Sequence, residues 1–75
     1  MIIRAEWPGY VVDVLVSQGQ EVEEDEALVL LEGTDSGHTA FYSNAPEACK
    51  VKRIIVEEGG FVEEDDELLE VSEVE

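Results

Sequence analysis

The chain repeats itself at a constant offset of forty residues, without a gap. Residues 11–31 align with residues 51–71, and the identical pairs include Gly19 with Gly59. Two copies are too few for a solenoid, whose repeats bury a core only by stacking on several neighbours. The repeat instead favours one domain in which two halves, related by a pseudo-two-fold axis, complete each other's core.

The repeat also sets the expected boundaries. A chain of 75 residues has room for one small domain, so residues 1–75 are predicted to form a single unit. The half-repeats cover approximately residues 7–32 and 45–72, and a hairpin loop over residues 33–38 joins them.

Each half predicts a strand, a turn and a second strand. The first strand is rich in β-branched residues, and the glycine that follows it, Gly19 or Gly59, adopts positive φ without steric cost. An acidic turn comes next, in which Asp25 or Asp65 is expected in the left-handed conformation. The expected strands cover residues 1–4, 10–16, 27–31, 39–43, 51–56 and 67–71.

Helices are disfavoured by the pattern of apolar residues. No stretch places them at i, i+3, i+4 and i+7 for three turns, and glycine or proline interrupts the chain often. The sequence therefore predicts an all-β fold, either two small sheets packed face to face or a flattened barrel. Val22 and Val62 are expected as isolated buried positions before the acidic turns.

The charge of the chain excludes several kinds of partner. Asp and Glu number 20 against 4 Lys and Arg, which gives a net charge of −16. Such a field repels nucleic-acid phosphates and anionic lipid headgroups, so neither nucleic acid nor a membrane is an expected partner. We expect a protein partner with a basic surface. A single cysteine, Cys49, and no apolar leader favour a cytoplasmic location.

The order and spacing of these residues resemble the biotinyl and lipoyl carrier domains. The matching positions are Gly19, Val22, Leu28, Glu32, Ala45, Pro46, Val51, Ile54, Ile55, Val56, Gly59, Val62 and Leu68. The resemblance covers nearly the whole chain. It implies a barrel-sandwich hybrid, a flattened barrel of two four-stranded antiparallel sheets with quasi-two-fold symmetry. Within the family the match leans toward lipoyl domains, because Glu32, Thr34 and Asp35 are similar to their E-T-D motif.

Three positions depart from the family's pattern. Asp25 and Asp65 stand where the family usually has glycine, and aspartate takes the left-handed conformation at modest cost. Cys49 replaces a glycine three residues after Pro46. If positive φ is required there, the cysteine would cost about 1–2 kcal/mol.

The attachment lysine of that family has no counterpart in the hairpin of this chain. The resemblance implies a lysine at the tip, whose amine carries biotin or lipoate through an amide. Three ways of aligning the loop put the equivalent position at Asp35, Ser36 or His38, and none is lysine. The chain's two lysines, Lys50 and Lys52, fall in the predicted strand that opens the second half. No cofactor is therefore expected.

These observations predict a non-catalytic docking or regulatory module rather than an enzyme. By resemblance it would belong to a 2-oxoacid dehydrogenase or carboxylase type of multienzyme complex. Two alternatives stay open. The chain is a genuine lipoyl or biotin carrier whose attachment lysine was replaced or moved to Lys50 or Lys52, or it is an assembly module of an efflux-adaptor type protein.

Other clusters have an ordinary interpretation beside a functional one. Asp35, Ser36 and His38 contain the residue types of a hydrolytic triad, but neighbours in one exposed loop seldom reach that geometry, so no catalytic residue is expected. The runs at residues 23–26 and 63–67 suit solvated turns better than a metal site, because they lack the spacing of a dedicated calcium loop. Docking of these runs to a basic groove on a partner stays open as a functional alternative.

Two single residues also allow two interpretations each. Cys49 has lysine neighbours that could lower its pKa and make it reactive, but a small buried side chain is the favoured interpretation. Trp7 is expected to be a half-buried packing residue, with a partner contact as the alternative.

Overall fold

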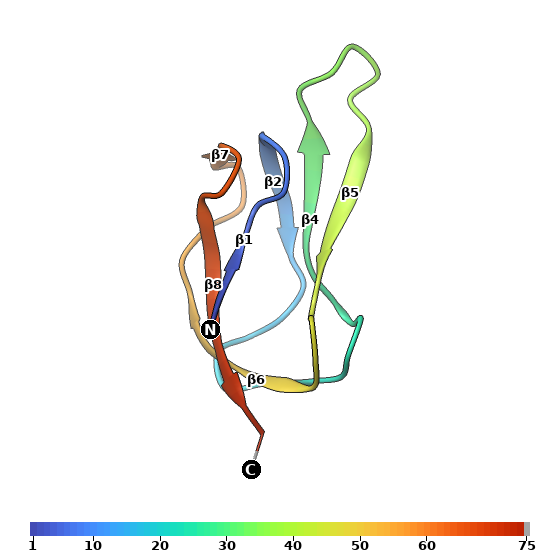
Figure 1. Cartoon of the computed structure of the whole chain (residues 1–75). Helices are drawn as coiled ribbons and strands as arrows, with labels where there is room; N and C mark the ends of the chain where they lie inside the picture. The colour runs from blue at the N-terminus through green and yellow to red at the C-terminus, as the bar shows by residue number, and fades with distance from the viewer. Residues whose placement is uncertain (75) are drawn as a thin grey trace.

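Eight β-strands and the turns between them make up residues 1–74, the part of the chain that the computed structural model describes (Figure 1). No helix occurs within residues 1–74, and so none there could cross a membrane. The strands are β1 (Ile2–Arg4), β2 (Gly9–Val14), β3 (Glu21–Val22), β4 (Ala27–Gly33), β5 (Ala40–Asn44), β6 (Cys49–Ile54), β7 (Phe61–Val62) and β8 (Glu67–Glu73).

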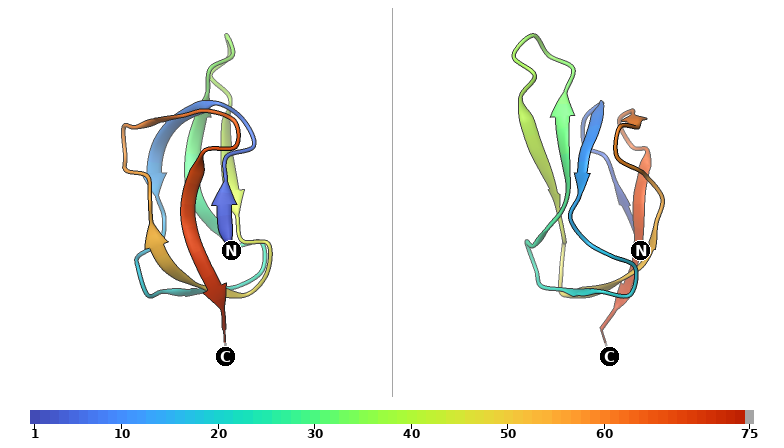
Figure 2. Two further views of the ribbon diagram at one scale, coloured as in Figure 1. Left: turned by 60° about the vertical axis from the view of Figure 1, so that its left-hand side comes forward. Right: turned by 180° about the vertical axis from the view of Figure 1, so that it is seen from behind.

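The strands form two four-stranded antiparallel sheets that face each other (Figure 2). One sheet has the order β1-β8-β6-β3 and the other has the order β5-β4-β2-β7. Adding four to each strand number, with β1 following β8, converts the first order into the second. The predicted all-β fold of two sheets with quasi-two-fold symmetry is therefore confirmed.

Backbone hydrogen bonds that tie the two halves together obey the same symmetry. Gly19 N–H donates to the Val51 carbonyl oxygen at 2.7 Å, and Gly59 N–H donates to that of Val11 at 2.8 Å. The two glycines have φ values of 89° and 85°, as predicted. The first turn of each half is thus hydrogen-bonded to a central strand of the other half, at Gly19 to β6 and at Gly59 to β2.

The acidic turns form a second symmetric pair. Asp25 and Asp65 have φ values of 65° and 70°, which confirms the predicted left-handed conformation. Asp25 N–H donates to the Ala45 carbonyl at 2.9 Å, and Asp65 N–H donates to the Ala5 carbonyl at 2.8 Å. Both aspartates therefore take the left-handed conformation at equivalent positions of the two halves.

The core lies between the sheets and consists of aliphatic side chains. Leu28, Leu31, Leu68 and Leu69 are completely buried, and no polar or charged residue is buried among residues 1–74. Burying an aliphatic side chain of this size contributes about 1.5–3 kcal/mol. Val22 and Val62 are buried as predicted, and they lie in the two-residue strands β3 and β7.

One detail of the sequence prediction needs correction, and one conditional statement is now decided. Trp7 is 59% exposed rather than half-buried, because it lies in the loop between β1 and β2 while Ala5 fills the core position nearby. The condition for strain at Cys49 is not met, because Cys49 lies in strand β6 and is not among the residues with positive φ.

Candidate functional site

The hairpin between β4 and β5 protrudes from one end of the molecule (Figures 1 and 2). Strand β4 ends at Gly33 and strand β5 begins at Ala40, so the connecting residues are 34–39. The loop is thus shifted by one residue from the predicted range of 33–38. All six connecting residues are exposed to solvent. This position makes the hairpin tip accessible to another protein.

A tight turn shapes the tip. The Asp35 carbonyl accepts a hydrogen bond from His38 N–H at 3.0 Å, which places Ser36 and Gly37 at the centre of the turn. His38 takes up the reversal with a φ of 48°. Below the turn, Gly33 N–H donates to the Thr39 carbonyl at 2.8 Å and closes the base of the loop.

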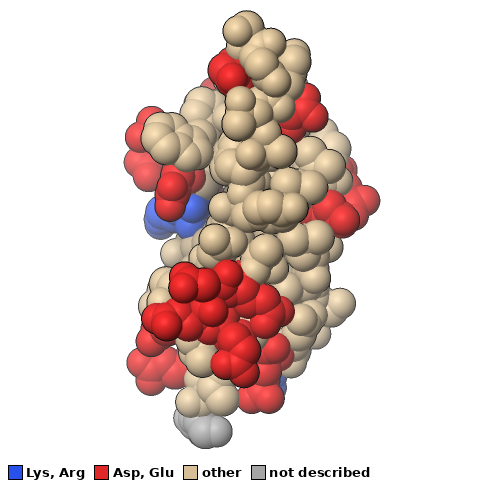
Figure 3. Space-filling view, turned by 90° about the vertical axis from the view of Figure 1, so that its right-hand side faces the viewer, with Lys and Arg blue, Asp and Glu red and all other residues tan. Residues whose placement is uncertain are grey.

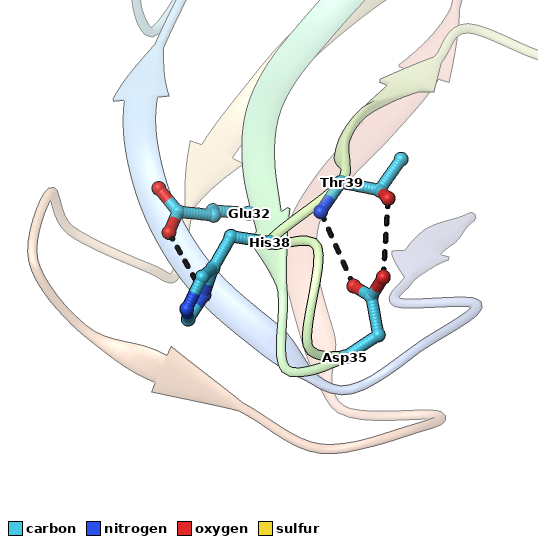
Figure 4. Close-up of polar contacts among 4 residues, drawn as sticks. All are labelled: Glu32, Asp35, His38 and Thr39. Atoms are coloured by element: carbon cyan, nitrogen blue, oxygen red, sulfur yellow. Dashed lines mark hydrogen bonds and ion pairs between the residues drawn. The ribbon is translucent and has the colours of Figure 1, made fainter.

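The Asp35 side chain stabilises the turn from within (Figure 4). Its carboxylate accepts hydrogen bonds from Thr39 N–H at 3.2 Å and from Thr39 Oγ1 at 3.1 Å. The bond from the Thr39 backbone is the main reason that the pKa of Asp35 lies below its ordinary value. Asp35 therefore serves as an ionised structural acceptor in the loop.

His38 is directed to a different neighbour. Its Nδ1 lies 3.3 Å from Glu32 Oε1, and the two side chains are 69% and 45% exposed (Figure 4). Asp35 is engaged by Thr39 instead, so these side chains do not form the hydrogen-bonded chain of a hydrolytic triad. Ser36 has no side-chain hydrogen bond in the described part of the protein.

These contacts separate the three candidate attachment positions. Asp35 and His38 have side chains that fold back onto Thr39 and Glu32, whereas Ser36 stands at the centre of the exposed turn. A carried group needs a protruding primary amine, and residues 34–39 contain none. The hairpin residues therefore do not fit biotin or lipoate.

Both lysines lie on β6, which begins at the end of the molecule opposite the hairpin (Figure 1). Lys50 is opposite Glu21 in the register between β3 and β6. Lys52 Nζ lies 3.8 Å from Glu70 Oε2, and the same carboxylate is 3.5 Å from Arg53 Nε. Lys50 and Lys52 are exposed and alternate along β6 with the buried Cys49 and Val51, so they lie on the outer face of a sheet and not in a projecting turn.

A groove of about 360 Å³ runs beside the hairpin base. The residues that line it include Trp7 and Pro8 from the loop before β2, and Asp35, Thr39 and Phe41 from the hairpin and β5. This groove was not predicted from the sequence, because Trp7 was expected to be a half-buried packing residue. The Trp-Pro-Gly sequence could have revealed it, because a loop of that kind leaves a large aromatic side chain with no strand to carry it inward.

Cys49 has the small buried side chain that was favoured for it. Cys49 is 1% exposed, and burial, together with the nearby negative charge of Glu47, raises the pKa of its thiol. No group of three or more His, Cys, Asp or Glu residues is arranged to hold a metal ion in residues 1–74.

Comparison with known proteins gives matches among solved structures only. No family model matches the chain, and no curated protein sequence matches it. A single-chain, multi-domain long-chain acyl-CoA carboxylase is similar over 99% of this chain, with a TM-score of 0.90 and 28% identity. The urea carboxylase of Kluyveromyces lactis is similar over 96%, with a TM-score of 0.86 and 21% identity. This chain spans 7% and 6% of the length of those two proteins. The fold is thus that of one small part of large carboxylase chains.

Proposed function

We propose that this chain is a non-catalytic docking or regulatory module with the fold of a biotin or lipoyl carrier and without a residue that can be loaded. The observation that carries the proposal is the tip of the hairpin. Its central residues are Ser36 and Gly37, and the loop offers no amine on which an amide could form. The module therefore presents the shape of a carrier to a partner but takes no cofactor.

A carboxylase-type enzyme assembly is the proposed setting. The sequence resemblance includes biotinyl carriers, and the two similar structures are an acyl-CoA carboxylase and a urea carboxylase. Both are far longer than this chain, which supports a role as one module that works beside catalytic subunits. The lipoyl-like E-T-D residues keep a 2-oxoacid dehydrogenase complex as a second setting.

Charge supports the choice of partner. A net charge of −16 on 75 residues speeds association with a basic protein surface, because complementary fields steer the encounter. We propose a cytoplasmic protein partner, with neither nucleic acid nor membrane involved. No observation in the described residues favours the efflux-adaptor alternative.

The competing carrier hypothesis requires a lysine elsewhere to be loaded. Lys52 lies near Glu70 on a sheet surface, and Lys50 stands in the same strand. A ligase that recognises a lysine at a projecting turn would find neither in that position. The proposal therefore predicts that both amines remain unmodified.

Ligase loading tests the proposal. The protein is expressed together with a biotin ligase and, separately, with a lipoate ligase, and its mass is measured. We expect the natural sequence to stay unmodified and Ser36→Lys to gain the group, because Ser36 occupies the centre of the turn. His38→Lys is the matched control. It introduces the same side chain outside the two central turn positions, and we expect it to be loaded less than Ser36→Lys. Loading of the natural sequence would overturn the proposal, and failure of both lysine variants would contradict the carrier shape of the hairpin.

A further inference from the structure

Residues 36–46 contain no Asp, Glu, Lys or Arg, although 32% of the chain is charged. This segment includes the whole of β5. The molecular face on the β5 side has an uncharged strip that runs down from the hairpin, with acidic side chains gathered at its lower end (Figure 3). This strongly acidic protein therefore has one strip of surface, along β5, without charged side chains.

Strand β5 is at the edge of its sheet, and β4 is its only partner strand within residues 1–74. The Thr39 carbonyl faces β4, because it accepts the hydrogen bond of Gly33 N–H. Backbone groups in an antiparallel pair alternate in direction, so Phe41 and Ser43 also face β4. The backbone N–H and C=O groups of Ala40, Tyr42 and Asn44 consequently point to the open side.

The symmetry-related edge strand provides an internal comparison. Strand β1 (Ile2–Arg4) is shorter and ends in a charged residue, and Arg4 Nη1 donates to the Asp65 carbonyl at 3.0 Å. Short edges and charged side chains are the usual protection against unwanted strand pairing. Strand β5 has five residues and neither a charge nor a proline. Of the two symmetry-related edge strands, β5 therefore lacks the protection against strand pairing that β1 has.

Two depressions lie next to this edge and share Trp7 and Phe41. The groove described above holds Asp35, and a second depression of about 140 Å³ holds Glu6 together with Tyr42. Each therefore combines an aromatic wall with one carboxylate. An arginine or lysine side chain suits such a place, because its stem packs on the aromatic rings and its cation meets the carboxylate.

We propose that the β5 edge binds an extended, basic peptide segment of a partner protein by strand addition. The segment pairs with the free backbone groups of Ala40, Tyr42 and Asn44, and its basic side chains enter the depressions beside Trp7. A second copy of this chain is the less suitable occupant, since it would bring another net charge of −16 to the same edge. The inference rests on the docking role proposed above and names its surface.

The test uses the whole chain labelled with ¹⁵N and a short peptide of alternating lysine and valine, long enough to pair with all of β5. We expect the peptide to shift the amide signals of β5 and to slow hydrogen exchange at Ala40, Tyr42 and Asn44. A peptide of alternating glutamate and valine is the control and should not bind. Shifts confined to the acidic turns at 23–26 and 63–67 would overturn the proposal, since they would report charge attraction alone.

Backbone methylation of the peptide distinguishes strand addition from other binding. One peptide carries N-methyl groups on its lysines only, and another carries them on its valines only. Alternate amides of an added strand face β5, so one of the two peptides should lose affinity by about tenfold or more while the other retains it. Equal affinity of the two methylated peptides would contradict the proposal.

A charge-matched pair of variants tests the depressions. Glu6→Gln should weaken peptide binding several-fold, whereas Glu57→Gln removes the same charge from a loop outside both depressions and should leave affinity nearly unchanged. Equal effects of the two variants would contradict the assigned side-chain contacts. Dimerisation through β5 in the absence of peptide would also overturn the proposal.

The two proposals fail in different ways. Loading by a ligase would overturn the unmodified docking module and leave the peptide result intact. Absence of peptide binding at β5 would overturn the edge proposal and leave the ligase result intact.

Discussion

Thr39 binds the Asp35 carboxylate twice, through its backbone N–H at 3.2 Å and through Oγ1 at 3.1 Å. The two residues lie on opposite sides of the central turn residues, so their contact clamps the hairpin tip. A carrier needs its tip to present one residue outward. Here the clamp supports a tip whose central residues are a serine and a glycine.

The clamp should depend on pH. Hydrogen bonds to the ionised form hold the pKa of Asp35 below that of an unfolded aspartate, so this contribution to stability is present above about pH 4. It is lost as the pH falls through the lower pKa of the folded state. We expect the Thr39 amide signal to titrate with a midpoint below that of an unstructured aspartate. A midpoint at or above the ordinary value would contradict the clamp.

Removing the clamp should loosen the tip and leave the rest of the fold intact. Asp35→Ala eliminates both acceptors, and we expect faster hydrogen exchange at Thr39 with an almost unchanged melting temperature, since the loop is exposed. Ser36→Ala is the matched control, because no side-chain bond of Ser36 is lost. Equal exchange rates in the two variants would show that Asp35 does not order the loop.

The fold could be predicted because single residues mark its turns and because both halves of the chain repeat these residues. Glycine at 19 and 59 and aspartate at 25 and 65 mark turns by their backbone preferences alone, and the structure has each of them at positive φ. The position of Trp7 could not be predicted in the same way. Its exposure depends on where β1 ends and on Ala5 occupying the core, which are tertiary facts.

The hairpin was only partly predictable for a related reason. The sequence shows that the loop has no lysine, yet it does not decide which of Asp35, Ser36 and His38 corresponds to the attachment position of a carrier. The turn is decided by side-chain bonds that connect Asp35 with Thr39 and by the contact of His38 with Glu32. Those contacts depend on the geometry of β4 and β5, which spacing along the chain does not specify.

Gly9 should be the glycine least tolerant of a side chain. A Cβ atom there would lie 2.6 Å from the Glu32 carbonyl oxygen, which is backbone and cannot easily move. We expect Gly9→Ala to destabilise the protein by about 1–3 kcal/mol, measured by urea unfolding. Gly37→Ala is the control, because its nearest contact would be 3.4 Å from an Asp35 oxygen. A change in unfolding free energy of equal size in both variants would refute this packing argument.

The thiol of Cys49 should be unreactive while the protein is folded. It is 1% exposed, and burial is the main cause of its raised pKa. A thiol reagent should therefore modify the native protein slowly and the unfolded protein rapidly. Because the folded pKa is the higher one, stability should decline as the pH rises above that of an unfolded cysteine, about 8.5. Rapid native labelling at neutral pH would contradict the buried assignment.

The mass of the natural protein shows whether this domain carries a prosthetic group. Protein isolated from its own cells is digested, and the peptides that cover residues 1–75 are weighed, with attention to Lys50 and Lys52. We predict that every peptide has the mass of its unmodified sequence. A biotinyl or lipoyl group on any residue of this region would contradict it.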